Sequence, residues 1–265
     1  MVYKIYRGLE KMNILIFDTE TINIEKCFCY NLGYKIINLD NKTTLVEKDF
    51  VIEQVWSNKQ MFETSYYANK KPLYISKLRG RKAKMIKWGF AMREMIKDIE
   101  TFNIEYAFAY NSDFDTKVFD FNCDWYKCNN ALDYVEIFDI WGFTSELIIK
   151  SLDNNKYKDF AIANNFISES NNLMNNANVW GKYLLNNLEW EEEHTALEDS
   201  KIETEILLYC LNFMNIAHYK VNKCIGSGLK IEKTLTIKDT ITNTIHCFTY
   251  SNKKDYKTKG LIVLS

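Results

Sequence analysis

The sequence predicts an α/β protein with helices on both faces of a mixed β-sheet, followed by a small C-terminal β-rich appendage. Residues 13–56 contain three segments rich in β-branched and aromatic residues, which favours antiparallel strands. Helical and extended patterns then alternate as far as residue 217, which is typical of helices packed on a sheet. From His218 onward, threonine alternates with isoleucine or leucine, which favours further strands.

The first three strands begin the predicted sheet. Residues 13–17 read Asn-Ile-Leu-Ile-Phe without polar alternation, which indicates a strand buried on both faces. Two further strands are predicted within 26–40 and 43–56. The polar residues 40–43 between them indicate an antiparallel turn.

The elements after residue 82 alternate between helix and strand. A helix is predicted over 83–102 because apolar residues recur there at helical spacing. The same patterns predict the other elements, which are a strand over 105–110, a helix from 112, a strand over 135–141, helices over about 156–166 and 173–188, and a last helix from 195.

The composition indicates a globular protein. The chain has 265 residues, of which 47% are hydrophobic and 15% aromatic, enough to bury a substantial core. The net charge of −1 provides no overall attraction to nucleic acid, but an enzyme that grips one strand end touches few phosphates. The seven cysteines match no zinc or redox spacing and are expected to be reduced thiols.

We expect a cytoplasmic protein with no membrane association. The N-terminus lacks the apolar stretch of a secretory signal, and no apolar run approaches membrane-spanning length. Abundant asparagine, lysine and isoleucine are typical of an AT-rich genome, such as that of a phage. The compartment would then be the host cytoplasm.

The predicted domains are an N-terminal extension over residues 1–11, a main domain over 12–217 and the β-rich appendage over 218–265. Residues 55–82 fit no compact pattern and are interpreted as an insertion that shapes access to a site. The basic stretch from Arg79 to Lys87 either contacts a nucleic-acid backbone or is a solvated start of a helix.

Two carboxylates end the first strand. Residues two apart in a strand project to one face, so Asp18 and Glu20 point the same way, while Phe17 and Thr19 point the other way. Like charges beside a core are costly without a positive partner, and a divalent cation would be one. Oxygen ligands of this kind suit Mg²⁺ or Mn²⁺. Solvated acids at the end of a strand are the alternative.

A second acid opens the helix predicted from residue 112. In the stretch Ala-Tyr-Asn-Ser-Asp-Phe-Asp, Asp115 lies in the first helical turn after a buried strand. Ser112 and Asp115 also fit a capping box, in which the acid merely satisfies a helix-terminal amide. Asp113 is a nearby competing acid.

The last predicted helix begins beside a histidine and an acid. Thr195 and Glu198 fit a second capping box, which places the helix start at Thr195. His194 then lies just before the helix on flexible backbone, and Asp199 lies about one turn inside it. This arrangement suits a proton acceptor beside a metal ligand. A surface histidine beside a capped helix is the alternative.

Together the three motifs resemble the DnaQ-like, or DEDDh, family of 3′–5′ exonucleases. The motifs are Phe-Asp-x-Glu, Asn-x-x-Phe-Asp and His-x-x-x-x-Asp, and their order matches that of the family. The resemblance covers residues 13–214, most of the chain. Thr195 stands where the family's tyrosine branch has its tyrosine, so this sequence is similar to the histidine branch.

The resemblance implies a ribonuclease-H-like fold and hydrolysis of terminal phosphodiesters with two Mg²⁺ or Mn²⁺ ions as cofactors. It implies that Asp18 would bridge both ions. Glu20 and Asp199 would hold the ion that carries the attacking water, and Asp115 would help to hold the second ion. His194 would remove the proton from that water.

The resemblance also implies where a substrate would bind. Thr21 and Ile22 follow the first motif, where family members position the terminal nucleotide. Asn111 and Phe114 of the second motif are further candidates for contact with a strand end, and a turn or packing role is the alternative for each. The expected partner is the 3′ end of a nucleic acid, DNA rather than RNA. A polymerase or another replication protein is a further candidate partner.

Three functions stay open at this point. The first is an exonuclease that trims single-stranded or frayed DNA, in proofreading or phage replication. The second is a 3′–5′ exoribonuclease, because no motif reports contacts to the 2′-hydroxyl. The third is a non-catalytic module that binds nucleic acid or protein on the same fold.

Overall fold

The computed structural model describes residues 12–25, 27–169, 171–222, 232–239 and 245–251. Their contacts divide the chain into two compact units, Met1–Gly142 with Asn175–Ile206 and Phe143–Met174 with Leu207–Ser265. The first unit carries the large sheet and the five predicted catalytic residues. The predicted domain boundaries at residues 11 and 217 stay a prediction.

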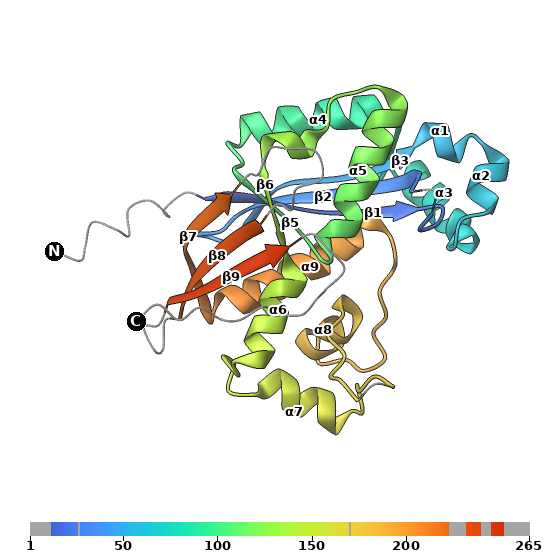
Figure 1. Cartoon of the computed structure of the whole chain (residues 1–265). Coiled ribbons are helices and arrows are strands. Elements are labelled where there is room, and N and C mark those ends of the chain that lie inside the picture. Colours follow the sequence, from blue (N-terminus) through green and yellow to red (C-terminus); the bar gives the residue numbers. More distant parts are fainter. Residues whose placement is uncertain (1–11, 26, 170, 223–231, 240–244, 252–265) are drawn as a thin grey trace. The chain divides into compact units, whose positions relative to one another are not determined.

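A six-stranded mixed sheet organises the first unit (Figure 1). Its strands are β1 (Asn13–Thr21), β2 (Cys29–Asn38), β3 (Thr43–Ile52), β4 (Lys84–Ile86), β5 (Tyr106–Ala109) and β6 (Glu136–Asp139). The order across the sheet is β4-β3-β2-β1-β5-β6. β2 is antiparallel to both β1 and β3, whereas β4, β5 and β6 join the sheet in parallel. The predicted α/β class and the antiparallel first three strands are confirmed.

Two helices, α4 (Trp88–Thr101) and α5 (Ser112–Tyr126), cover one face of this sheet (Figure 1). Their buried side chains share one core with alternate residues of β1 and β2. Phe119 packs edge-to-face on Phe17 and on Trp88, with ring centroids 5.4 and 5.3 Å apart. Because side chains alternate along a strand, Asp18 and Glu20 point to the opposite face of the sheet.

The last helix, α9 (Ala196–Leu211), lies against that opposite face through its first turn. Gly33 of β2 permits this contact, because a Cβ atom at that position would lie 2.0 Å from the backbone nitrogen of Leu197. Gly33 is the partner of Asp18 in the β1–β2 register. The first turn of α9 therefore lies directly over the strand pair that carries Asp18 and Glu20.

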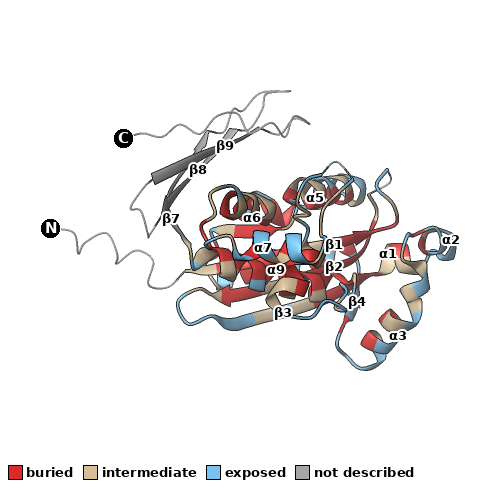
Figure 2. Ribbon diagram, turned by 90° about the horizontal axis from the view of Figure 1, so that it is seen from below, coloured by how far each residue is buried: buried red, intermediate tan, exposed pale blue. Residues whose placement is uncertain are grey.

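Residues 53–79 form a helical insert between β3 and β4. Its segments are α1 (Glu53–Trp56), α2 (Lys59–Glu63), the 3-10 helix η2 (Ala68–Lys70) and α3 (Lys71–Arg79). The insert has its own small core, in which Val55, Phe62 and Tyr74 pack against Tyr30 of β2. Figure 2 shows β1 and β2 as largely buried and α2 as mostly exposed.

Two of the predicted boundaries before residue 102 are wrong. The strand predicted within 43–56 ends at Ile52, where the helical insert begins. The helix predicted over 83–102 is split, because Met85 and Ile86 belong to β4 and the helix begins only at Trp88. A short apolar run fits both a strand and a helix, so the apolar pattern alone could not separate these two elements.

Later in the chain, one helix was not predicted and another is shorter than predicted. α6 (Ile140–Ile149) begins where the sequence predicts the end of a strand. α8 (Ala177–Leu184) replaces the helix predicted over 173–188, because the Asn176 side chain caps it by accepting a hydrogen bond from the Val179 N–H. The 3-10 helix η3 (Ala131–Tyr134) precedes β6.

In the second unit, α7 (Lys156–Ala163) confirms the helix predicted from residue 156. The Tyr157 hydroxyl donates a hydrogen bond to the Met174 carbonyl at 2.7 Å. β7 (Met214–Asn222), β8 (Glu232–Asp239) and β9 (Ile245–Ser251) are antiparallel and pair in this order. Residues 223–231, 240–244 and 252–265 of the predicted appendage lie outside the described residues, so the appendage stays a prediction.

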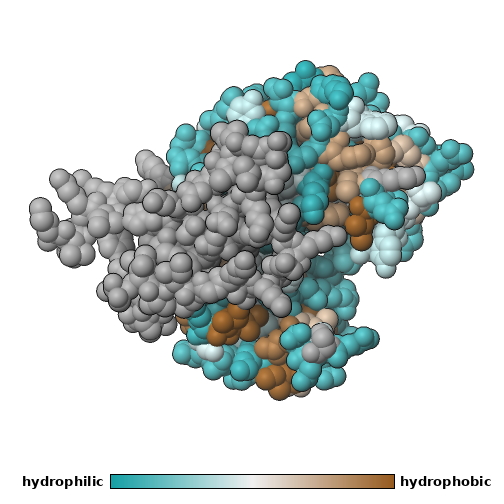
Figure 3. All heavy atoms as spheres, viewed as in Figure 1, coloured by the Kyte–Doolittle hydropathy of each residue, from teal (hydrophilic) through white to brown (hydrophobic). Residues whose placement is uncertain are grey.

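In the part of the chain that the structure describes, none of the helices combines the length and the apolar character needed to cross a membrane. In the coloured part of Figure 3, hydrophilic areas alternate with hydrophobic ones. Exposed large apolar side chains of the first unit include Ile24, Tyr66 and Trp125. Tyr66 belongs to the helical insert, and its ring packs edge-to-face on that of Tyr67.

Candidate active site

The carboxyl end of β1 carries Asp18 and Glu20. Glu20 is buried, Asp18 is half-buried, and Glu20 Oε2 accepts a hydrogen bond from the Tyr30 hydroxyl at 3.4 Å. Burial and then the charge of Asp115 raise the pKa of Asp18. Burial and then the charges of Asp18 and Asp199 raise the pKa of Glu20. These carboxylates therefore repel one another, and their charged forms need a compensating cation.

The turn before α9 carries His194. The helix begins at Ala196, so Thr195 flanks its N-terminus, within one residue of the predicted start. His194 adopts left-handed backbone with φ of 49°. For a residue other than glycine this conformation costs about 1–3 kcal/mol. The side chain remains 38% exposed, so a substrate could reach its ring.

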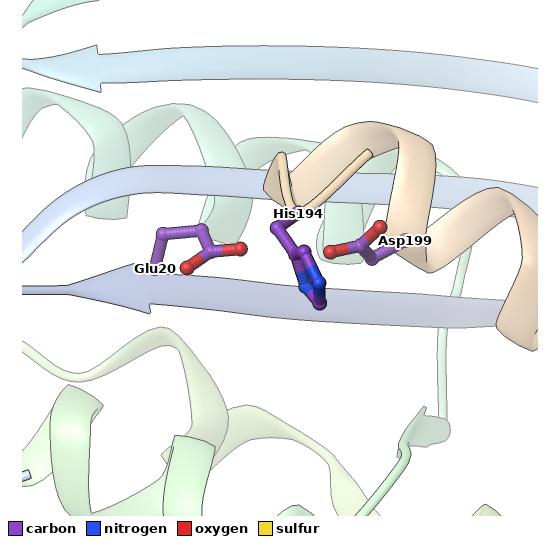
Figure 4. Close-up of side chains that lie close together, drawn as sticks. All are labelled: Glu20, His194 and Asp199. Carbon is purple, nitrogen blue, oxygen red and sulfur yellow. The ribbon is translucent and has the colours of Figure 1, made fainter. Parts of the chain in front are cut away.

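Glu20, His194 and Asp199 converge in space. Each residue offers one ligand atom, and these atoms all lie within 4.8 Å of one another. Figure 4 shows the His194 ring between the two carboxylates, with Glu20 on β1 and Asp199 on α9. The first and third sequence motifs therefore meet at one place, and their oxygen and nitrogen donors form a candidate metal centre.

The surroundings of the site raise the pKa of Asp199 but lower the pKa of His194. Burial and then the charge of Asp18 raise the pKa of Asp199 to about 9, so without a bound cation this carboxyl group is protonated near pH 7. Burial and then the positive charge of Lys70 lower the pKa of His194. The imidazole is therefore neutral near pH 7 and can accept a proton.

Asp115 meets β1 from the other face of the sheet. Asn111 precedes α5 and Ser112 is already helical, so Ser112 does not act as the cap that the sequence offers as an alternative. Asp115 Oδ1 instead accepts a hydrogen bond from the Thr19 hydroxyl at 2.6 Å. Burial raises the pKa of Asp115 to about 7, and its charge acts on Asp18. The hydrogen bond from Thr19 thus joins Asp115 of the second motif to β1, the strand that carries Asp18 and Glu20.

The helical insert supplies a positive partner for these acids. The charge of Lys70 opposes the effect of burial by lowering the pKa values of Glu20 and Asp199. The Lys70 ammonium group donates a hydrogen bond to the Glu193 carbonyl, beside His194. The sequence gives no signal for this residue, because Lys70 lies in a stretch without periodicity or motif. Only the fold brings it to the acids.

Tyr67 of the same insert stacks on the candidate base. The rings of Tyr67 and His194 are nearly parallel, with 15° between their planes and 4.6 Å between their centroids. Lys70 Nζ lies 4.5 Å from the centroid of the Tyr67 ring. Burial and then the charge of Glu20 raise the pKa of Tyr67 to about 12, so its hydroxyl stays protonated. The insert thus restricts the ring of His194.

A buried lysine fixes the loop that carries His194. Lys77 of α3 is 8% exposed, and its Nζ donates a hydrogen bond to Thr195 Oγ1 at 2.7 Å. Its Nζ also pairs with Glu193 Oε1 at 2.8 Å and with Asp49 Oδ2 of β3 at 3.5 Å. These bonds join the helical insert, the sheet and the loop before α9.

Asn31 of β2 fixes the start of α9. It is fully buried, and its Oδ1 accepts hydrogen bonds from the Ala196 N–H at 2.8 Å and the Tyr74 hydroxyl at 3.1 Å. Its Nδ2 donates to Asp49 Oδ1 at 2.6 Å. The sheet therefore caps α9 through Asn31. Glu198, the acid of the predicted capping box, pairs instead with Lys201 at 3.0 Å within α9.

The four predicted substrate contacts lie in different surroundings. Ile22 is 2% exposed and packs in the core of the helical insert, so its side chain has a packing role. Thr21 is also buried, and its hydroxyl donates to the Asn23 carbonyl at 3.3 Å. Asn111 is exposed, and Phe114 is half-buried against the main core. Of the four, Asn111 and Phe114 retain accessible surface.

Asp139, at the end of β6, supports the second motif. Its Oδ1 accepts hydrogen bonds from the backbone N–H groups of Asn111 at 2.9 Å and Trp141 at 2.8 Å. Burial raises the pKa of Asp139 to about 6, and these bonds lower it in part. Asp139 therefore holds the turn from which Asp115 is presented.

No known protein-family model matches this chain, and no curated protein matches it at a significant level. The resemblance to DnaQ-like exonucleases therefore rests on the three motifs and on where the fold places them. The structure itself supports an α/β fold with a six-stranded mixed sheet.

The residues of the site fit a divalent cation. Carboxylate oxygens dominate the donor set, which suits Mg²⁺ or Mn²⁺. A further buried acid, Glu203, has one oxygen, Oε2, without a hydrogen-bond partner among the described residues. Acids gathered in this way repel each other until a bound cation reverses the local balance of charge.

Proposed function

We propose that this protein is a metal-dependent 3′–5′ exonuclease of the DnaQ-like, histidine-branch type, on a ribonuclease-H-like sheet. The observation that carries the proposal is the convergence of Glu20, His194 and Asp199 from the first strand and the last helix of the unit. A fold by itself does not define a function, so the proposal rests on this site.

The proposed substrate is the 3′ end of single-stranded or frayed DNA, in proofreading or phage replication. This choice extends the resemblance of the motifs, as do a cytoplasmic location and a polymerase as partner. The exposed fraction of His194 supports an open site that a strand end could enter. Phe114 and Asn111 are the accessible candidates for contact with that end.

Four carboxylates would hold two Mg²⁺ or Mn²⁺ ions. Asp18 would contribute to both, Glu20 and Asp199 to one, and Asp115 to the other. When bound, such ions stabilise the charge on the entering and leaving oxygens of a phosphodiester under attack. Without them the carboxylates would repel the phosphate of a substrate.

The residues of the chain would move the proton. His194 accepts the proton of the attacking water at a ring nitrogen, because its lowered pKa keeps the imidazole neutral near pH 7. Tyr67 limits the orientations of that ring by stacking on it. Lys77 and Asn31 fix the loop and the helix start on either side of His194.

The test uses the purified full chain with DNA and RNA oligonucleotides of matched sequence, labelled at the 5′ end. We expect a ladder of products shortened from the 3′ end with Mg²⁺ or Mn²⁺ and none with a chelator, and faster shortening of DNA. Faster shortening of RNA would make the protein an exoribonuclease. An absence of shortening by folded, metal-bound protein would contradict the proposal and favour a binding module.

A further inference from the structure

Glu203 is a buried acid of the first unit. It is not among the four acids that the proposed mechanism uses. It follows Asp199 by four residues on α9, so the two side chains project from one face of the helix. Glu203 is 4% exposed, and its Oε2 has no hydrogen-bond partner among the described residues. A buried carboxylate oxygen without a partner is costly, so the position of Glu203 needs a physical reason.

The charges around Glu203 are negative. After burial, the largest contributions that raise its pKa come from Asp18, Asp115 and Asp199, in that order. The charges of acids on β1, on α5 and on its own helix therefore all act on Glu203. These are the carboxylates that the proposed function assigns to cations.

Two other buried acids of the described chain, Asp49 and Glu146, each pair with a lysine. Asp49 lies 3.5 Å from Lys77 and accepts a hydrogen bond from Asn31. Glu146 pairs with Lys150 at 2.5 Å. Among the described residues, Glu203 forms no ion pair with a lysine, an arginine or a histidine, so a cation from solution is the partner that its surroundings lack.

We propose that Glu203 is a fifth carboxylate of the cation site, which would hold a divalent cation beside Asp199 either directly or through a bound water. The inference rests on the proposed function, because it assumes that the acids of the site bind a metal. It adds a residue that the three sequence motifs do not contain.

The test is the affinity of the full chain for Mn²⁺ alone, measured by isothermal titration calorimetry without nucleic acid. Glu203→Gln keeps the size of the side chain and removes its charge. We expect it to weaken Mn²⁺ binding by about 10–100-fold, the usual effect of removing a group that supports a metal ligand. Glu205→Gln is the matched control, because Glu205 lies two residues further on the same helix and is exposed. Its affinity should equal that of the unchanged protein.

Each of the other possible results would contradict the role of Glu203, the proposed function, or both. Equal Mn²⁺ affinity of Glu203→Gln and the unchanged protein would overturn the role of Glu203 and leave the proposed function standing. No Mn²⁺ binding by the unchanged protein would overturn both. Mn²⁺ binding that depends on Glu203, without any shortening of oligonucleotides, would keep the cation site and overturn the exonuclease. If Glu203→Gln does not fold, Glu203→Met replaces it, since a buried apolar side chain of similar length avoids the unpaired polar group.

Discussion

Replacing Lys77 by methionine tests how the loop that carries His194 is held. In the folded protein, Lys77 Nζ lies 2.8 Å from Glu193 Oε1, 3.5 Å from Asp49 Oδ2 and 2.7 Å from Thr195 Oγ1. The side chain of Asp49 is only 1% exposed and that of Lys77 is 9% exposed. Methionine keeps most of the apolar stem of lysine, so the substitution removes the charge with little change in volume.

The loss of Lys77 leaves Asp49 as a buried carboxylate without its cation. Breaking a buried pair by removing one partner costs about 3–5 kcal/mol. The side chain of Glu193 is 43% exposed, so its pair with Lys77 adds at most about 1 kcal/mol. We therefore expect Lys77→Met to lower the free energy of unfolding by about 3–6 kcal/mol at pH 7.

The loss of stability caused by Lys77→Met should change with pH in a direction that the pKa of Asp49 determines. Burial raises the pKa of Asp49, and Lys77 lowers it in part, so its removal raises the pKa further. A carboxyl group whose folded pKa is raised stabilises the fold at low pH and destabilises it as the pH rises through that pKa. The destabilisation by Lys77→Met should therefore be smaller at pH 5 than at pH 7.

Urea denaturation, followed by tryptophan fluorescence, measures this loss. Lys59→Met is the control, because Lys59 is 78% exposed and pairs with Glu63 on the surface at 3.7 Å, so its removal should cost less than about 1 kcal/mol. Asp49→Asn combined with Lys77→Met should recover part of the lost stability. A loss below about 1 kcal/mol for Lys77→Met at pH 7 would refute the buried pair as the anchor of the loop.

Four further substitutions test the site. Gly33→Ala would place a Cβ atom 2.0 Å from the backbone of Leu197, so we expect a loss of stability of at least about 1–3 kcal/mol in thermal unfolding, together with a loss of hydrolysis. His194→Ala should slow single-turnover hydrolysis by about 10²–10⁴-fold while Mn²⁺ affinity stays high, and an unchanged rate at all pH values would exclude His194 as the base. Lys70→Met removes a positive charge that lowers the pKa of His194, so the acidic limb of the rate against pH should move to higher pH. An acidic limb that does not move would contradict that influence. Tyr67→Leu removes the ring that stacks on His194, and a fall in kcat of up to about tenfold with little change in KM is the expected result.

The strands and the three motifs could be predicted because their signals are local. Residues 14–17 are apolar without alternation, and β1 spans them. The period of two places Asp18 and Glu20 on one face, opposite the side on which Phe17 meets Phe119. Thr195 and Glu198 predict the start of α9 to within one residue, although Asn31 of β2 accepts the hydrogen bond from the Ala196 N–H there. Each of these predictions needs only a few neighbouring residues.

The remainder of the site depends on contacts between distant residues, which no local pattern reports. Lys70 and Tyr67 lie in a segment without periodicity, and only the fold of the helical insert brings them to His194. Gly33 has no sequence signal for its role, since the close approach of Leu197 is visible only in three dimensions. Glu203 reads as one more acid on a helix, and its burial depends on how α9 packs.

The most direct test of the account compares single-turnover hydrolysis of a 5′-labelled single-stranded DNA by the unchanged protein, Asp199→Asn and Glu205→Gln, with Mg²⁺ present. Asp199 belongs to the cluster with Glu20 and His194, whereas Glu205 is exposed on the same helix. We expect shortening from the 3′ end by the unchanged protein and by Glu205→Gln, and none by folded Asp199→Asn. Equal shortening by all three proteins, or by none of them, would contradict the claim that these residues form a catalytic site.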